Sequence, residues 1–308
     1  MRRLLVAASM TALLASSAVA GEEKPMFISA KEAKELLGKP GVVFVSGDTK
    51  DVFNVNHIPG SVVMDAHHIH HTDITGQLHC SPLYQCPEEA EKFIGEQGID
   101  NDTYVIAYDD YKGPNASGVY HFFKSIGHDK VSILNGGMMA MKAEGVTLEK
   151  GPQKKVQPKT YRIDRSKIRF DIMATKEEVK KAVDDLEAKG DASRYVIIDT
   201  RRFEEIIGVT KLDNVARGGH IPYAKFIEWK HFSDANKKLT VKDAATIKAI
   251  LEKNGITKDK EIYTYCHVGT GRGSYLFTIL KMLGYDKVKV YTGSWDEWGN
   301  DFNMPIKR

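Results

Sequence analysis

The chain has 308 residues, of which 42% are hydrophobic and 28% charged. These values suit a folded globular protein of about two domains that buries real cores. The formal net charge is only +3 and no basic block stands out, so nucleic acid is excluded as an expected partner.

The first twenty residues read as a targeting segment rather than as part of the fold. Two arginines precede an apolar stretch over 4–14, and Ala18-Val19-Ala20 fits a small-residue cleavage site. The apolar stretch is too short to span a bilayer comfortably, so we expect no stable membrane insertion. The sequence therefore predicts a signal peptide over 1–20, cleavage near Ala20, and a periplasmic or secreted mature protein.

A first α/β segment is expected over 26–150. Ser29-x-x-Glu32 fits a capping box at the start of a helix, and short β-branched runs then alternate with helical stretches. Cys80 and Cys86 lie close together and could form a disulfide in an oxidising compartment. The sequence leaves the paired and the unpaired state open.

Five of the eleven histidines crowd into the same segment: His67, His68, His70, His71 and His79. Imidazole is a common metal ligand, but this spacing matches no defined site, so we expect solvated loop residues and neither a metal nor a cofactor. A second hypothesis is that this segment overhangs a cleft between the domains and helps to choose the substrate.

Residues 151–168 are rich in Pro and Lys and suit a linker, and a second α/β segment over 169–308 repeats the first. Thr175-x-x-Glu178 is again a capping box. The internal repeat is supported by matches in the same order along both copies: His57-Ile-Pro-Gly60 with His220-Ile-Pro-Tyr223, Val42–Val45 with Val196–Asp199, Tyr104–Tyr108 with Glu261–Tyr265, and Gly127–Val131 with Gly284–Val288.

Cys266 ends a short apolar run and precedes a glycine-rich turn and a helix-like stretch. The loop amides and the helix N-terminus would surround the sulfur with positive potential and favour the thiolate, which is the nucleophilic form; the alternative is a buried structural cysteine. At the repeat offset, the first copy has Asp109 in place of Cys266 and Asn115 in place of Arg272. We therefore expect chemistry in the second copy and a structural or substrate-shaping role for the first.

These features resemble the tandem-domain rhodanese family, the thiosulfate and 3-mercaptopyruvate sulfurtransferases, over essentially all of the mature chain. The motifs that carry the resemblance are His57-Ile-Pro-Gly60, Gly219-His-Ile-Pro222, Asp199-Thr-Arg201, the Cys266 loop and Gly293-Ser-Trp-Asp-Glu-Trp298. The resemblance implies two tandem rhodanese-like domains, each with a mostly parallel sheet flanked by helices. Trp295 and Trp298 are expected to be packing residues, because methionines occupy the matching places in the first copy.

The resemblance also implies a mechanism. The Cys266 thiolate would attack the outer sulfur of a small anionic donor such as thiosulfate, and the resulting persulfide would pass its sulfur to cyanide or a thiol. The loop residues expected to hold these anions are His267, Val268, Gly269, Thr270, Gly271 and Arg272, the last as a bidentate oxyanion clamp. Asp199 and Arg201 would support the site, or form only a structural ion pair.

Two departures leave rival functions open. His267 and Val268 fit neither the thiosulfate nor the mercaptopyruvate pattern, and Glu205 stands where thiosulfate-type enzymes have an arginine. Cys266-x5-Arg272 is also the signature of cysteine phosphatases, and arsenate reductases of this fold share the longer loop. An oxyanion phosphatase or reductase is thus the second hypothesis, and a non-catalytic persulfide carrier or partner-binding module is the third.

Overall fold

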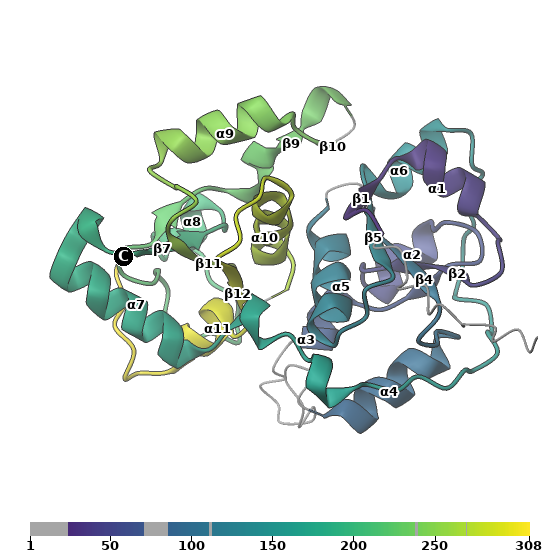
Figure 1. Ribbon diagram of the computed structural model, residues 1–308, viewed down its shortest axis with the longest axis horizontal. Coiled ribbons are helices and arrows are strands. Elements are labelled where there is room, and N and C mark those ends of the chain that lie inside the picture. Colours follow the sequence, from purple (N-terminus) through teal and green to yellow (C-terminus); the bar gives the residue numbers. More distant parts are fainter. Residues whose placement is uncertain (1–23, 71–85, 111–112, 238–239, 269) are drawn as a thin grey trace, which may run out of the picture.

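The computed structural model describes residues 24–70, 86–110, 113–237, 240–268 and 270–308, apart from the side chains of His70 and Lys237. They form two α/β lobes, each built around its own sheet (Figure 1). The expected signal peptide, Cys80, His71, His79 and Gly269 lie outside the described residues. Within the described part of the chain, no helix has the length and apolar character needed to cross a bilayer.

The first lobe contains a five-stranded parallel sheet in the order β1-β5-β4-β2-β3. Its strands are β1 (Phe27–Ile28), β2 (Val42–Ser46), β3 (Val62–Val63), β4 (Tyr104–Tyr108) and β5 (Val131–Leu134). Its helices are α1 (Ala30–Leu36), α2 (Lys50–Val55), α3 (Ala66–His70), α4 (Pro87–Glu96), α5 (Pro114–Ser125) and α6 (Gly137–Ala143). Parallel neighbours need crossover connections, which is why helices separate the strands.

The second lobe repeats this arrangement, with the parallel order β6-β12-β11-β7-β8. Its strands are β6 (Met173–Ala174), β7 (Tyr195–Asp199), β8 (Lys225–Phe226), β11 (Glu261–Tyr265) and β12 (Val288–Tyr291). Its helices are α7 (Lys176–Lys189), α8 (Phe203–Ile206), α9 (Ala244–Lys253), α10 (Arg272–Met282) and α11 (Ser294–Asn300). Two further short strands, β9 (Ser233–Asp234) and β10 (Thr240–Val241), pair antiparallel. The predicted tandem α/β fold is confirmed.

Matching hydrogen bonds relate the two lobes residue by residue. The hydroxyl of Tyr108, which ends β4, accepts the backbone N–H of Ile58 at 3.2 Å. In the second lobe the hydroxyl of Tyr265, which ends β11, accepts the N–H of Ile221 at 3.1 Å. The residue after each tyrosine, Asp109 or Cys266, therefore occupies the same place in its lobe.

The strand register corrects one detail of the repeat. Asp199 pairs with Tyr265 in the second sheet, and Ser46 pairs with Tyr108 in the first. Ser46 is thus the counterpart of Asp199, so the predicted match of Val45 with Asp199 was wrong by one residue. Strands buried on both faces are near-continuous apolar runs, so their hydrophobic pattern does not fix the register.

Both predicted capping boxes are formed. At the start of α1, Ser29 Oγ accepts the N–H of Glu32 at 3.2 Å while Glu32 Oε2 accepts the N–H of Ser29 at 2.8 Å. At the start of α7, Thr175 and Glu178 make the same reciprocal pair at 3.2 and 3.0 Å. Each box satisfies two backbone donors that the helix itself leaves without a partner.

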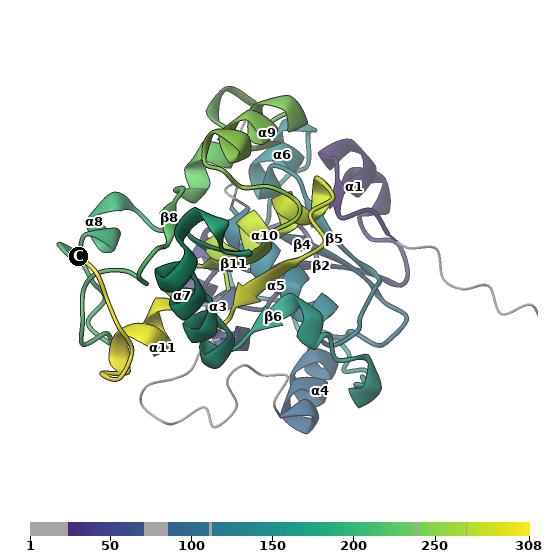
Figure 2. The same ribbon diagram turned by 60° about the vertical axis from the view of Figure 1, so that its left-hand side comes forward.

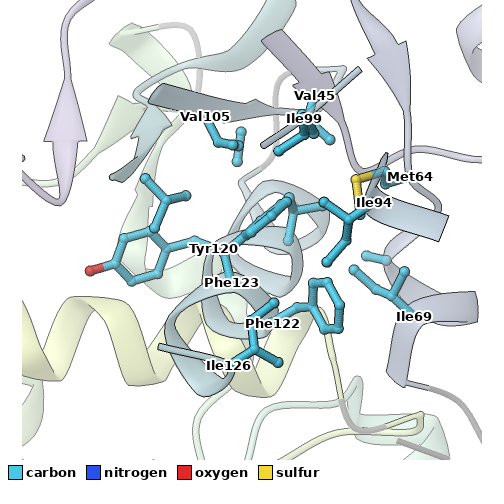
Figure 3. Packing of buried hydrophobic residues seen from close by; sticks show 14 of the residues in the cluster. Val45, Met64, Ile69, Ile94, Ile99, Val105, Tyr120, Phe122, Phe123 and Ile126 are labelled. Carbon is cyan, nitrogen blue, oxygen red and sulfur yellow. The ribbon is translucent and has the colours of Figure 1, made fainter. Parts of the chain in front are cut away.

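Helix α5 fills the core of the first lobe. Its residues Phe122 and Phe123 are fully buried and belong to one apolar cluster with Val105 from β4 and Ile94 from α4 (Figure 3). Helix α5 is covered on several sides, so its buried residues include small and polar side chains such as Ser117 and Ser125 as well as the apolar ones.

Helices α5 and α10, which are counterparts, lie side by side at the boundary between the lobes (Figures 1 and 2). The contact depends on Gly118 of α5, because a Cβ there would lie 3.0 Å from Ala66 Cβ and 3.4 Å from Thr270 Cβ. Ser117 Oγ and Thr278 Oγ1 are 3.5 Å apart across the same boundary. This packing brings α3 of the first lobe against the loop that precedes α10.

The segment between the copies packs on the first lobe. The N–H of Lys159 donates to the carbonyl of Gly95 at 2.9 Å, and Tyr161 and Ile163 are buried in the first core. A Cβ on Gly95 would lie only 2.4 Å from the Lys159 oxygen. The part of the expected linker over 159–163 is therefore an extended segment docked beside α4.

Candidate active site

The thiol of Cys266 lies directly after β11, at the carboxyl end of the second sheet, where open α/β sheets bind ligands. Cys266 is a free cysteine and is only 1% exposed. The C-terminal motif holds its backbone: Cys266 N donates to Ser294 Oγ at 3.2 Å, and Trp295 N donates to the Cys266 carbonyl at 3.1 Å. Trp295 and Trp298 are fully buried, as predicted for packing residues.

Helix α10 begins against the backbone of Cys266. Gly271 has φ 145°, which strongly favours glycine, and a Cβ on Gly273 would lie 3.2 Å from the Tyr265 carbonyl carbon and 3.5 Å from Cys266 N. The first N–H groups of an α-helix have no acceptor inside the helix and carry partial positive charge. The close approach that Gly273 allows thus places an anion-stabilising helix end beside the thiol.

A cleft of about 880 Å³ opens between the lobes at this loop. Its second-lobe wall includes the described loop residues Cys266, His267, Val268, Thr270, Gly271 and Arg272. The same wall also contains Arg202, Leu212, Asn214, Trp229 and Lys230. Its first-lobe wall contains Asp48, Val52, His67, Asp109, Asp110, Pro114 and Asn115. The predicted loop therefore faces a space that both lobes line.

The first lobe contacts the loop directly through α3. Thr270 Oγ1 donates to the carbonyl of Ala66 at 2.8 Å, which ties the loop to the residue before His67. His67 lines the cleft with a side chain that is 44% exposed. His68 has a side chain that is 72% exposed. Of the clustered histidines whose side chains the structure describes, His67 therefore lies at the interdomain cleft, where the hypothesis of substrate selection requires it, and His68 is solvated.

Arg272 is paired with a carboxylate of its own lobe. Its two terminal nitrogens donate to the two oxygens of Glu205 at 2.6 and 3.0 Å. Burial alone would raise the pKa of Glu205, but the hydrogen bond and charge of Arg272 outweigh it and hold this pKa at about 2. His267 Nδ1 lies 3.7 Å from Glu205 Oε1. Arg272 was predicted as a bidentate clamp for a substrate oxyanion, but in the structure it binds Glu205 in this way. In the sequence, Glu205 stands out only as a departure from the thiosulfate-type pattern.

Asp199 and Arg201 form a buried ion pair behind the site. Arg201 donates to both Asp199 oxygens, at 2.7 Å for the closest contact, and to the carbonyl of Gly219 at 2.7 Å. Both side chains are at most 1% exposed, and neither lines the cleft described above. The hydroxyl of Thr200, between them, donates to the carbonyl of Tyr265 at 2.8 Å. The pair thus supports the strand that leads to Cys266.

Asp109 fills the corresponding place in the first lobe with a negative charge of its own. Its carboxylate accepts backbone N–H groups from Gly113 at 3.0 Å, Asn115 at 3.1 Å and Ala116 at 3.3 Å. These donors come from the turn and the first residues of α5. The loop of the first lobe is therefore an anion cradle that is occupied by its own side chain.

Asp48 lies beside this cradle and was not foreseen as a site residue. Its Oδ1 accepts from the Asn115 side-chain nitrogen at 3.0 Å. Burial first, and the negative charge of Asp109 second, raise the pKa of Asp48 to about 8. In the corrected register Asp48 is the counterpart of Arg201, so the repeat was the signal that could have found it.

The raised pKa of Asp48 predicts that stability falls with rising pH. The folded protein keeps a proton that the unfolded chain loses near pH 4, so this stabilisation is complete below that pH and is lost as the pH rises through about 8. This group should lower the free energy of unfolding by on the order of 1–3 kcal/mol between mildly acidic and mildly basic pH, and Asp48→Asn should abolish that decrease. Urea unfolding at mildly acidic and mildly basic pH, followed by circular dichroism, measures it.

Asp102→Asn is the matched control, because the Asp102 side chain is 93% exposed. This variant should keep the pH dependence of the wild type. Parallel pH profiles for Asp48→Asn and the wild type would contradict the assignment of the proton to Asp48.

The remaining cysteine prediction falls partly outside the described residues. Cys86 is disulfide-bonded. Cys80 is not described, so its pairing with Cys86 stays a prediction. Among the described residues, no group of three or more His, Cys, Asp and Glu side chains is arranged to hold a metal ion.

Comparison with known proteins places the chain among relatives of similar length. Residues 29–144 and 175–301 match the family described as rhodanese-like domain. The sulfur carrier protein TtuD of Thermus thermophilus is 31% identical over 295 residues, which cover 92% of this chain and 96% of that protein. The thiosulfate sulfurtransferase of Azotobacter vinelandii is 30% identical over 284 residues, covering 92% and 97%.

A solved structure shows the same fold. The anaerobic ergothioneine biosynthesis enzyme of Chlorobium limicola, in complex with trimethyl histidine, superposes with a TM-score of 0.73 at 23% identity. The match covers 92% of this chain and 70% of that one.

Proposed function

Because this chain belongs to the rhodanese family, we propose that it moves a sulfane sulfur from thiosulfate or a related donor to a thiophilic acceptor through a persulfide on Cys266. Its relatives support sulfur transfer as the general activity. The observation that carries the proposal is the free thiol of Cys266, held against a helix N-terminus at the edge of the interdomain cleft.

Asp109 supports the persulfide as the intermediate. A carboxylate oxygen stands two bonds beyond Cβ, as the outer sulfur of a cysteine persulfide does. Two of the amides that hold Asp109, those of Asn115 and Ala116, have counterparts in Arg272 and Gly273 at the start of α10. In our proposal these amides stabilise the negative outer sulfur on Cys266.

The proposed reaction has two steps that balance in atoms and charge. The Cys266 thiolate attacks the outer sulfur of thiosulfate, the S–S bond of the donor breaks, and sulfite leaves with the electron pair. Cyanide or a thiolate then attacks the outer sulfur of the persulfide. The Cys266 thiolate leaves and is ready for the next donor.

The first expected result is a mass change. Incubation with thiosulfate, followed by intact mass spectrometry without reductant, should show a gain of one sulfur atom that cyanide removes. Cys266→Ala should show no gain. A wild-type protein that stays at its original mass with every sulfane donor would contradict the proposed function.

The oxyanion hydrolase or reductase is the second candidate, because Arg272 does turn back beside the cysteine loop. Its two terminal nitrogens both donate to Glu205, so a substrate oxyanion would have to compete with this carboxylate for the same face of the guanidinium. Sulfur transfer requires only that Cys266 reach the sulfur atom of a donor. It is therefore more compatible with an Arg272 side chain that is paired with Glu205 than oxyanion hydrolysis is.

We also propose that the protein is exported. The basic residues, apolar stretch and small-residue site over 1–20 have the composition of a signal peptide. The disulfide at Cys86 suits an oxidising compartment. N-terminal sequencing of the mature protein from a periplasmic extract should begin near Gly21, and an unprocessed cytoplasmic chain would contradict export.

A further inference from the structure

The charge at the cysteine loop is largely cancelled by Glu205. This residue lies on α8, and its side chain is only 15% exposed. It binds both terminal nitrogens of Arg272, and its Oε1 also lies 3.7 Å from His267. A buried pair of this kind has little net charge to offer to a ligand.

The other cationic side chains of the described cleft wall are largely exposed and lie near carboxylates of their own lobe. On the second lobe Lys230 is 61% exposed and lies 3.2 Å from Glu228, and Arg202 is 67% exposed with its Nε 3.9 Å from Glu205 Oε2. On the first lobe the wall carries Asp48, Asp109 and Asp110. A second negative charge on a donor would therefore meet the carboxylate of Glu205 behind Arg272 and the acidic side chains of Asp109 and Asp110 across the cleft.

The cleft also offers more than a small inorganic anion can use. It is an open cleft of about 880 Å³, and its walls include the apolar side chains of Val52, Leu212 and Trp229. Apolar surface of this kind favours an organic group on the ligand.

We propose that Glu205 makes this site select sulfur donors that carry one negative charge and an organic group, in preference to the dianion thiosulfate. This inference rests on the proposed sulfur transfer at Cys266. The donor class is an organic thiosulfonate or persulfide anion. For a thiosulfonate, the Cys266 thiolate attacks the outer sulfur, the donor S–S bond breaks, and the organic sulfinate leaves with the electron pair.

Two donors that differ by one charge give a direct test. Methanethiosulfonate has the sulfonyl–sulfane core of thiosulfate with a methyl group in place of one charged oxygen. For each variant, kcat/KM is measured for both donors with saturating cyanide, and the ratio of the two values is compared with the wild-type ratio. Differences in intrinsic donor reactivity cancel in this comparison.

Glu205→Gln should raise kcat/KM for thiosulfate relative to methanethiosulfonate by about ten- to thirtyfold, the effect of removing one charge a few ångströms away in a medium of intermediate polarity. The gain should shrink as ionic strength rises. Glu205→Asp keeps the charge and should keep the preference for methanethiosulfonate. Glu204→Gln, on the exposed side of the same helix, should also keep the wild-type ratio.

An unchanged ratio in a folded Glu205→Gln protein, or an equal change for both donors, would overturn the inference and leave sulfur transfer standing. If Glu205→Gln does not fold, the wild type alone decides. Benzenethiosulfonate should then be a better donor than its 4-carboxylate derivative, and equal kcat/KM values would refute charge selection. Failure of every donor to modify Cys266 would refute the proposed function instead.

Discussion

Cys266→Ser is expected to abolish sulfur transfer, with thiocyanate formation from thiosulfate and cyanide reduced by at least about a thousandfold. A serine hydroxyl is not ionised near neutral pH and cannot form the S–S bond of a persulfide. The substitution exchanges one atom at a side chain that is 1% exposed, so the fold should be retained. A stopped thiocyanate assay, with circular dichroism as a check on folding, measures the effect.

The matched control removes the other two cysteines. A Cys80→Ser, Cys86→Ser double variant should retain turnover, because the proposed mechanism uses Cys266 alone and Cys86 is not among the residues that line the described cleft. Turnover that survives in Cys266→Ser would show that another group carries the sulfur. Loss of turnover in the double variant alone would point to the same conclusion, provided that this protein is folded.

The same proteins separate the three candidate functions. Sulfur transfer requires thiocyanate formation that depends on Cys266. An oxyanion hydrolase would form no thiocyanate but would release phosphate from an aryl phosphate in a Cys266-dependent reaction. A non-catalytic carrier would gain one sulfur atom at Cys266 and release it in a single turnover at most.

The position of Cys266 in the fold could be predicted from sequence because its cause is local. An apolar run, a cysteine, a glycine-rich turn and a helical stretch determine strand, loop and helix, and the structure has β11, Cys266 and α10 in that order. The repeat added a comparison inside the chain, since Asp109 follows β4 as Cys266 follows β11.

The partners of the loop could not be predicted, because they depend on how distant segments dock. Glu205 lies 67 positions from Arg272, and the Thr270–Ala66 bond joins the two lobes. No periodicity of apolar residues encodes such contacts. The sequence therefore predicted that the loop lies between a strand and a helix, and it predicted Arg272 as an open clamp, whereas in the folded chain Arg272 is bound by Glu205.

Asp199→Asn is expected to destabilise the second lobe by about 3–5 kcal/mol. The change preserves the shape of the side chain but leaves the guanidinium of Arg201 buried without its counter-charge. Arg201 is 1% exposed, and its Cζ lies 4.8 Å from the ring centre of Trp295, so water cannot replace the lost partner. All three tryptophans of the chain are in the second half, so their fluorescence during urea unfolding reports on this lobe.

Asp184→Asn is the control for an ion pair in water. Lys180 and Asp184 are one helical turn apart on α7, and Asp184 is 56% exposed, so this change should cost at most about 0.5 kcal/mol. A cost for Asp199→Asn no larger than that of the control would show that the buried pair does not stabilise the lobe.

The double change Asp199→Leu with Arg201→Met tests the origin of the penalty. If the cost of Asp199→Asn comes from an uncompensated buried charge, removing both charges should recover most of the lost stability. Thr200, between the two residues, still donates to the carbonyl of Tyr265, so the strand end before Cys266 should keep its position. Recovered stability together with retained thiocyanate formation would assign Asp199 and Arg201 to the support of the site, and recovered stability with lost turnover would assign them to its chemistry.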